Sequence, residues 1–233
     1  MIGIIGAMSG EVQGLKELMQ NVTVTEKSGM HFYSGTLHEK QVVVVQSGVG
    51  KVNAGICAAL LIHLFGVNVL INTGIAGSLN NSIDIGDVVL STDAVQHDFD
   101  ATSFGKYRYG QIPGLDTLSF EADNELISIA EEACLRVNHS VKVFRGRIVS
   151  GDQFISSREK KQWIIEHFGG FCTEMEGSAV AQAAYLSKVP FLIVRVISDK
   201  ADDSSVVDYP EFEKKAIEHS VRLTNEIIKN IRK

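Results

Sequence analysis

Short apolar runs rich in β-branched residues recur along the chain, and each run predicts a β-strand. Gly, Pro, Asn or Asp bounds each run, as is typical where strands end. The runs lie at residues 2–5, 42–45, 67–71, 88–90, 141–149 and 191–197. Between them, apolar residues near the spacing i, i+3, i+4 predict helices at residues 11–19, 51–64, 123–137, 158–168, 177–186 and 211–231.

This alternation of strands and helices predicts the class of fold. Strands that are apolar throughout are buried on both faces, and strands separated by helices pair mainly in parallel. We therefore expect an α/β protein with a mixed, mostly parallel central sheet flanked by helices on both faces. No linker, repeat or low-complexity tract interrupts the pattern, so residues 1–233 are expected to form a single domain.

Unusual residues follow the predicted strands. In open α/β sheets, ligands bind beyond the carboxyl ends of the strands. The segments at those ends are residues 6–12, 46–51, 72–78, 150–155, 173–177 and 198–203. Together they hold many glycines and the acidic residues Glu11, Asp152, Glu174, Glu176 and Asp199. We expect these carboxylates to meet around one glycine-lined pocket.

Charge and cysteine content exclude some partners and compartments. The formal net charge is -6, and the Lys and Arg residues are scattered, so we expect no binding to nucleic acid. No apolar run approaches the roughly 18 residues that span a membrane, and "MIGIIGAM" lacks the basic region of a signal sequence. Cys57, Cys134 and Cys172 are widely spaced without a CxxC pair, as is typical of reduced thiols. We expect a cytoplasmic protein.

Several familiar catalytic motifs are absent from the sequence. The segment "SGVGK" has Val45 and Val52 where a phosphate-binding loop needs Gly and Ser or Thr. No GxGxxG follows the first strand, and neither GxSxG nor HExxH occurs, so no cofactor or metal is expected. The only cluster that resembles metal ligands is "HDFD" at residues 97–100, which we interpret as a hydrogen-bonded loop anchor.

A pocket rich in carboxylates suits the hydrolysis of a glycosidic bond. One acid protonates the leaving group, while another activates water against an oxocarbenium-like transition state. Glu11 would begin a helix, where the dipole stabilises its ionised form, although Glu is also common there for purely structural reasons. Asp199 has an equally ordinary interpretation as a capping residue. Glu174 and Glu176 would point to the same side of a strand, so the periodicity does not choose between them.

Seven motifs, in order from residue 2 to about residue 212, together resemble one family. They are "IGIIGAM..EV", "SGVGKVNAG", "INTGIAGS", "HDFDATSFG.YRYGQIPG", "SGDQFI", "TEMEGSAVAQ" and "RVISDKAD". The sequence is similar to the 5'-methylthioadenosine/S-adenosylhomocysteine nucleosidases, which have the nucleoside phosphorylase fold. The resemblance implies cleavage of these two adenine nucleosides by water, with 5'-deoxyadenosine as a further plausible substrate. It also implies a homodimer.

The resemblance assigns roles to individual positions. Glu11 would activate water, and Asp199 would protonate N7 of adenine. Glu176 would hold the ribose hydroxyls, and Glu174 would be a supporting acid that is hydrogen-bonded inside the site. Further substrate-binding residues are Met175 against the sugar, Phe154 stacked on adenine, the main chain of Ile155 at the base edge, Ser198 beside Asp199, Tyr209 near the ribose and alkylthio group, and Phe104 and Pro113, which would reach the neighbouring subunit's pocket.

Some positions depart from the family's pattern. Ser9 and Gly10 replace acids beside Glu11, and Ile75 replaces a serine whose hydroxyl would face the site. Three alternatives therefore stay open: a phosphate-dependent purine nucleoside phosphorylase, an aminofutalosine-type nucleosidase, and a binding protein without turnover. A phosphorylase needs cations for phosphate, whereas Glu11 and Asn72 occupy the positions where its arginines are expected.

Overall fold

The computed structural model describes residues 1–137 and 139–231. The predicted domain, 1–233, includes positions 138, 232 and 233, which lie outside the described residues. Each of the six predicted strands is present among the described residues. They are β1 (Ile2–Gly6), β4 (Lys40–Gln46), β5 (Val69–Ser78), β6 (Val88–Gln96), β8 (Val143–Ser150) and β10 (Phe191–Asp199).

The predicted helices are also present, and local signals set several of their ends. In the described part of the chain they are α1 (Ser9–Leu18), α2 (Lys51–Phe65), α3 (Asn124–Val137), α4 (Arg158–Phe168), α5 (Gly177–Ser187) and α6 (Ser205–Asn230), with a short 3₁₀ helix, η1 (Thr102–Phe104). At the start of α4 the Ser157 hydroxyl accepts from the Lys160 amide, and left-handed Gly169 ends the helix.

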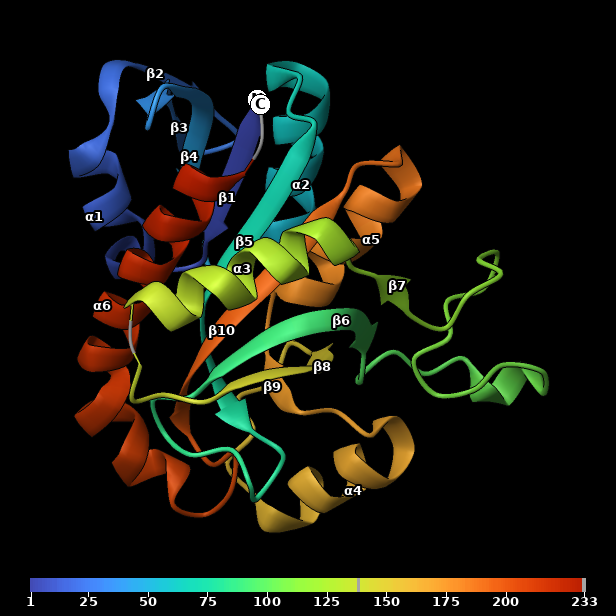
Figure 1. Ribbon diagram of the computed structural model, residues 1–233. Coiled ribbons are helices and arrows are strands. Elements are labelled where there is room, and N and C mark those ends of the chain that lie inside the picture. Colours follow the sequence, from blue (N-terminus) through green and yellow to red (C-terminus); the bar gives the residue numbers. More distant parts are fainter. Residues whose placement is uncertain (138, 232–233) are drawn as a thin grey trace.

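The sheet confirms the predicted α/β class and is mixed. Its strands follow the order β10-β6-β8-β9-β5-β1-β4-β3-β2, in which β9 is Cys172–Glu174, β3 is Met30–Leu37 and β2 is Gln20–Lys27. Strand β5 also pairs with β10. The strands β5, β10, β6, β8 and β9 therefore form a closed ring, with β1 and β4 continuing the sheet to one side (Figure 1). Parallel pairing joins β1 to β4 and β5, and also joins β5 to β10 and β6 to β8.

Four strands were not predicted, and they supply most of the antiparallel pairing. They are β2 (Gln20–Lys27), β3 (Met30–Leu37), β7 (Phe120–Glu121) and β9 (Cys172–Glu174). The edge strand β2 is mostly exposed, so its sequence "QNVTVTEK" contains no apolar run. Strands β7 and β9 have two and three residues, too few for any periodicity to appear.

The prediction that residues 72–78 follow a strand is wrong. Strand β5 continues through this segment to Ser78, paired with β10 as far as Gly77 and Asp199. The sequence analysis ended this strand at residue 71 because Gly74 and Gly77 follow, and glycine is depleted in strand interiors. A Cβ at position 74 would lie 2.6 Å from Oε1 of Glu11, and one at position 77 would lie 2.8 Å from Oδ1 of Asp199. These glycines leave the strand room for two carboxylates.

The predicted start of the last helix, at residue 211, is also too late. Helix α6 begins at Ser205 and contains Pro210, the residue directly before the predicted start. The Ser205 hydroxyl donates to Asp199, 2.7 Å away, and accepts from the Asp202 amide. These tertiary contacts fix the extra first turns, and they bring Tyr209 inside the helix.

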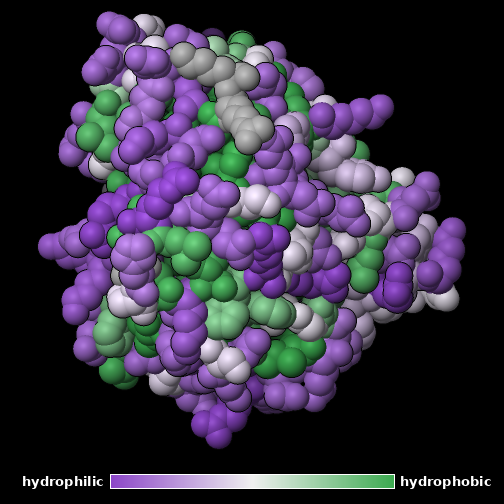
Figure 2. Space-filling view, viewed as in Figure 1, coloured by the Kyte–Doolittle hydropathy of each residue, from purple (hydrophilic) through white to green (hydrophobic). Residues whose placement is uncertain are grey.

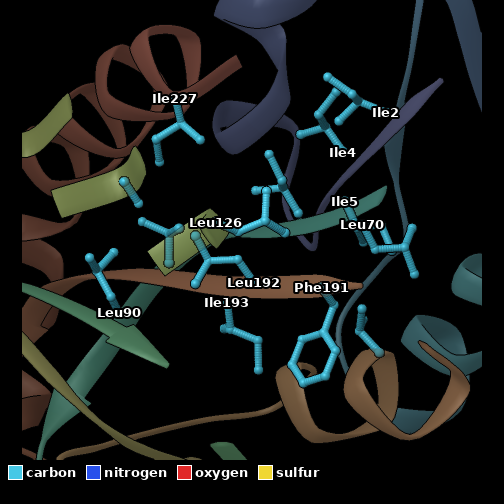
Figure 3. Packing of buried hydrophobic residues seen from close by; sticks show 14 of the residues in the cluster. Ile2, Ile4, Ile5, Leu70, Leu90, Leu126, Phe191, Leu192, Ile193 and Ile227 are labelled. Atoms are coloured by element: carbon cyan, nitrogen blue, oxygen red, sulfur yellow. The ribbon is translucent and has the colours of Figure 1, made fainter. Parts of the chain in front are cut away.

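Helices cover both faces of the sheet, as predicted. Helix α6 packs on β5 and β10 and also contacts α1 and α3, while α2 and α5 pack against each other (Figure 1). Ile227 of α6 and Leu126 of α3 join the same buried cluster as Leu192 of β10 (Figure 3). Burial of these side chains removes apolar surface from water, which is the main force that holds the layers together.

Hydrophilic residues cover most of the face shown in Figure 2, with hydrophobic residues gathered in its lower half. Within the described ranges, no helix is long and apolar enough to cross a membrane.

Helix α1 approaches α6 closely enough that glycine is required at position 14. A Cβ there would lie 2.8 Å from Cγ1 of Val221, whereas a Cβ at Gly55 of α2 would meet nothing within 4 Å. We predict that Gly55→Ala raises the free energy of unfolding by up to about 1 kcal/mol through helix propensity, and that Gly14→Ala lowers it. Urea denaturation of both variants tests this, and equal gains in stability would contradict the close approach.

Candidate active site

A cavity that is partly open to solvent lies at the carboxyl ends of β1, β5, β9 and β10. Each of the six predicted strand-end segments contributes to its wall. The lining residues are Ala7, Met8, Glu11, Val49, Ile75, Ala76, Gly77, Phe154, Thr173, Glu174, Met175, Glu176, Ser198, Asp199 and Tyr209. Ile155 lines a smaller hollow that shares Phe154, Met175 and Asp199 with this cavity.

Two predicted residues lie away from the cavity. Phe104 ends the 3₁₀ helix η1, and its side chain is 74% exposed. Pro113 is exposed in the same segment between β6 and β7. Neither residue contributes to the cavity wall of its own chain. Their proposed contact with a neighbouring subunit stays a prediction.

Glu11 is buried in the first turn of α1, with its carboxylate directed back toward the end of β1. The Met8 amide donates to Oε2 of Glu11 over 2.9 Å, in the manner of a capping box. The sequence analysis expected the helix start to favour the ionised form of Glu11, and the Met8 amide and the Arg195 charge do favour it. Burial outweighs them and raises the pKa of Glu11. A carboxylate with a raised pKa is a better proton acceptor.

Asp199 lies at the end of β10, where its two oxygens have different surroundings. Oδ1 accepts from the Ala201 amide over 2.8 Å and from the Ser205 hydroxyl over 2.7 Å. Oδ2 is 2.9 Å from the Ser198 hydroxyl, which is also 3.3 Å from the carbonyl oxygen of Ala76. Because Oδ1 already has two donors, a proton on Asp199 belongs on Oδ2.

The two neighbouring glutamates lie in different elements. Glu174 ends β9, and Glu176 comes directly before α5, so strand alternation does not relate their side chains. Oε1 of Glu176 accepts from the Gly50 amide over 2.8 Å. Burial and then the charge of Glu174 raise the pKa of Glu176 to about 7.

Glu174 is held by a buried network that the sequence analysis did not identify. Arg195, which is 1% exposed in β10, forms an ion pair with Glu174 and hydrogen bonds to Asn72. The Ser150 hydroxyl donates to Glu174, as does the Gly177 amide over 2.8 Å. The sequence does contain a signal for this network, namely a single cation, Arg195, inside the apolar run "FLIVRVI". A buried Arg requires an acidic or polar partner.

Two aromatic rings that contact each other line the cavity. Phe154 is half-exposed, and its ring centroid is 5.5 Å from that of Tyr209 at an interplanar angle of 84°. The Tyr209 hydroxyl donates to Glu213 over 3.1 Å and lies 3.7 Å from Sδ of Met8. An exposed flat ring beside buried carboxylates can stack on a heteroaromatic base.

The two aspartates of the "HDFD" segment anchor their loop, as predicted, whereas the buried ring of His97 makes no hydrogen bond within the described part of the chain. Asp98 pairs with Lys51 and accepts from the Asp152 amide, while Asp100 accepts from the Thr102 amide and hydroxyl. Among the described residues, no group of three His, Cys, Asp or Glu side chains could hold a metal ion.

Comparison with known proteins defines the class. A family model described as the phosphorylase superfamily matches residues 1–229, so the chain belongs to that superfamily. A 5'-methylthioadenosine/S-adenosylhomocysteine nucleosidase from Staphylococcus haemolyticus is 41% identical over 230 residues, covering 98% of this chain and 99% of the relative. Within the superfamily the chain therefore belongs to this nucleosidase family, whose members are N-glycosyl hydrolases, as the sequence analysis predicted.

Solved structures agree with this placement. The corresponding nucleosidase from Neisseria meningitidis, in complex with methylthio-immucillin-A, has a TM-score of 0.94 and 39% identity, covering 99% of each chain. A futalosine hydrolase from Helicobacter pylori has a TM-score of 0.92 and 31% identity, covering 99% of this chain and 97% of that one. The fold is shared across both, so the residues around the substrate must distinguish their specificities.

The buried ion pair beneath the cavity yields a stability prediction. Arg195→Met leaves Glu174 without a cation, and we expect it to lower the free energy of unfolding by about 3–5 kcal/mol. The double variant Arg195→Met/Glu174→Gln removes both charges and should recover part of this loss. Chemical denaturation of the three proteins tests this, and a double variant no more stable than Arg195→Met would count against charge burial as the cause.

Proposed function

We propose that this protein hydrolyses the N-glycosidic bond of 5'-methylthioadenosine and S-adenosylhomocysteine, and also that of 5'-deoxyadenosine. The products are adenine and the 5-substituted ribose. The observation that carries the proposal is the meeting of Glu11, Glu176 and Asp199 on the wall of one cavity. Carboxylates are sufficient for this reaction, since it needs a base, an acid and stabilisation of a cationic sugar.

Glu11 is the proposed base. Its carboxylate takes a proton from water as the water oxygen forms a bond to the anomeric carbon. The raised pKa of Glu11 suits this transfer, because a carboxylate with a raised pKa accepts a proton more effectively than an ordinary one. The Met8 amide fixes the carboxylate, so its orientation does not depend on the substrate.

Asp199 is the proposed acid. Its Oδ2 delivers a proton to N7 of adenine while the bond between N9 and the anomeric carbon breaks, so the base leaves as a neutral molecule. The Ser198 hydroxyl can turn from Oδ2 toward the Ala76 carbonyl, which leaves it able to accept from a protonated Oδ2. The two donors on Oδ1 then hold the remaining oxygen in place.

Glu176 is proposed to hold the ribose. One carboxylate oxygen accepts from the Gly50 amide, and the other is directed to the hydroxyls of the sugar. Hydrogen bonds from ribose hydroxyls to a carboxylate strengthen as positive charge develops on the sugar. Met175 provides an apolar contact for the sugar, and Phe154 and the Ile155 main chain bind adenine.

Water is favoured over phosphate as the nucleophile. Phosphate binding requires cations, and the described residues that line the cavity include no Lys or Arg. Arg195 is nearby, but its guanidinium is committed to Glu174 and Asn72. The assay that tests the proposal is adenine release with and without phosphate. Formation of ribose 1-phosphate would show that the protein is a phosphorylase. If no adenine were released from any adenine nucleoside, the protein would be a binding protein without turnover.

The cavity wall also bears on which 5'-substituent of the substrate is preferred. The futalosine hydrolase similarity keeps an aminofutalosine-type substrate as a second candidate. Ile75, Val49, Met8 and Tyr209 give the wall a largely apolar character, which favours a short alkylthio group over a polar one. A panel of 5'-substituted adenosines, compared by kcat/KM, distinguishes the two classes.

Assembly and location are also proposals. A homodimer follows from the family resemblance, in which Phe104 and Pro113 serve the neighbouring subunit's pocket. Cys57, Cys134 and Cys172 are free and buried, which supports a reducing compartment such as the cytoplasm.

The acid and base assignments predict the effect of two substitutions. Glu11→Gln and Asp199→Asn keep the shape of each side chain and remove its proton transfer, so each should lower kcat by about 10²–10⁴-fold. Binding of a substrate analogue, measured by calorimetry, should survive in both. Near-normal turnover in Asp199→Asn would show that another group protonates the base.

The pKa of Glu176 predicts the pH dependence. Below pH 7 this carboxylate gains a proton and loses an acceptor for the ribose, and Glu11, with its raised pKa, changes in the same direction. The kcat/KM should therefore fall about tenfold for each pH unit below the pKa of Glu176, and more steeply wherever Glu11 is protonated as well. A constant kcat/KM between pH 5 and pH 8 would be inconsistent with either carboxylate acting in its ionised form.

A further inference from the structure

A cluster of charged residues outside the cavity wall has no role in the reaction proposed above. Lys51 begins α2, Asp98 follows β6 and Asp152 follows β8. The Lys51 ammonium contacts Oδ1 of Asp98 at 2.5 Å and Oε1 of Gln96 at 3.0 Å. The side chains of Lys51 and Asp98 are only 15% and 14% exposed, so solvent screens this ion pair less than a surface pair.

Main-chain bonds tie the same three segments together. The Lys51 amide donates to Oδ1 of Asp152 over 2.8 Å, and the Asp152 amide donates to Oδ2 of Asp98 over 2.8 Å. Lys51 is therefore joined to the segment after β8 twice, through its own amide and through Asp98. We call Lys51, Asp98 and Asp152 the clasp.

The clasp holds the residue that contacts the ribose-binding carboxylate. Gly50 directly precedes Lys51, and its amide donates to Oε1 of Glu176 over 2.8 Å. Gly50 has φ of +98°, a conformation that glycine adopts readily, and a Cβ there would lie 3.1 Å from Oδ1 of Asp152. The direction of this amide therefore depends on the fixed start of α2.

We propose that the clasp positions the Gly50 amide on Glu176 and thereby fixes the orientation and ionisation of that carboxylate for ribose binding. Lys51, Asp98 and Asp152 are positioning residues, since they act through Gly50. The inference rests on the proposed function, because it deepens the role of Glu176. Asp152 is also two residues before Phe154, so the clasp joins the segments that would bind ribose and base.

The charges around Glu176 make the Gly50 bond important. Glu174 of β9 and Glu11 of α1 disfavour its ionised form, while Arg195 of β10 and the Gly50 amide favour it. Loss of one hydrogen bond to a charged group shifts the balance toward the protonated form. A loosened clasp should therefore raise the pH at which Glu176 ionises.

The first test is a double-mutant cycle. Lys51→Met removes the ammonium and keeps the main-chain amide, and we expect kcat/KM at pH 7 to fall about 10- to 100-fold, as for one hydrogen bond to a charged group. In a Glu176→Gln background the same substitution should cost less than about threefold, because its target is already lost. An equal loss in both backgrounds would overturn the proposal.

Control variants separate this effect from a general loss of an ion pair. If the Lys51→Met protein folds poorly, Asp98→Asn can replace it in the test. This substitution keeps the size of the side chain, and we expect the same loss of kcat/KM. Arg147→Met breaks an ion pair with Asp93 between the same strands, β8 and β6, away from the cavity wall. We expect it to change kcat/KM by less than about threefold. A loss as large as that of Lys51→Met would contradict a specific role for the clasp.

A second test needs no substrate. Because folding raises the pKa of Glu176, wild type loses stability relative to Glu176→Gln as the pH rises, until the carboxylate is ionised in the folded protein. The pH at which this loss of stability ends marks ionisation of Glu176 in the folded protein, and it should rise by about one pH unit when Lys51→Met is introduced into both proteins. An unchanged end point would refute the clasp. A raised end point in a protein that releases no adenine would retain the clasp and reject the proposed function.

Discussion

The burial of four carboxylates on the wall of one cavity constrains the rest of this structure. Glu11, Glu174, Glu176 and Asp199 are each 8% exposed or less, and the buried Arg195 interacts with the three glutamates. The interior cannot hold several bare charges, so each acid must be paired, hydrogen-bonded or partly protonated. Arg195 pairs with Glu174, main-chain amides and hydroxyls serve the others, and the pKa values of Glu11 and Glu176 rise.

Strand β5 makes this concentration of acids sterically feasible. It pairs with β1, β9 and β10, so carboxylates carried by neighbouring elements meet along it. Side chains at Gly74 and Gly77 would occupy the space of Glu11 and Asp199. The ring of strands places the cavity at its end and leaves small residues where the acids approach the main chain. The site is therefore a product of the sheet's closure as much as of the loops that follow the strands.

Glu11 and Asp199 can have a structural role at the start of a helix and also the proposed catalytic role. Glu11 accepts from the amide before its own helix, as an ordinary capping glutamate does, and Asp199 holds the first turn of α6 through Ser205. Such contacts fix a carboxylate without help from a ligand, which is what preorganised catalysis requires. Both oxygens of Glu174 accept hydrogen bonds from protein groups, whereas among the described residues Glu176 accepts one, from the Gly50 amide. This difference supports the proposed division of labour, in which Glu176 binds the ribose and Glu174 is a supporting acid.

The sequence by itself determined the six main strands, the order of helices between them and the strand ends where the acids gather, because hydrophobic periodicity and glycine positions are local signals. It also carried the motifs that identify the family. Only the tertiary structure decided the pairing of Glu174 with Arg195, the contact of Gly50 with Glu176, the early start of α6 and the continuation of β5. These depend on residues far apart in the chain. The raised pKa of Glu11 has the same origin, because the burial that outweighs its helix-terminal position exists only after the layers have packed.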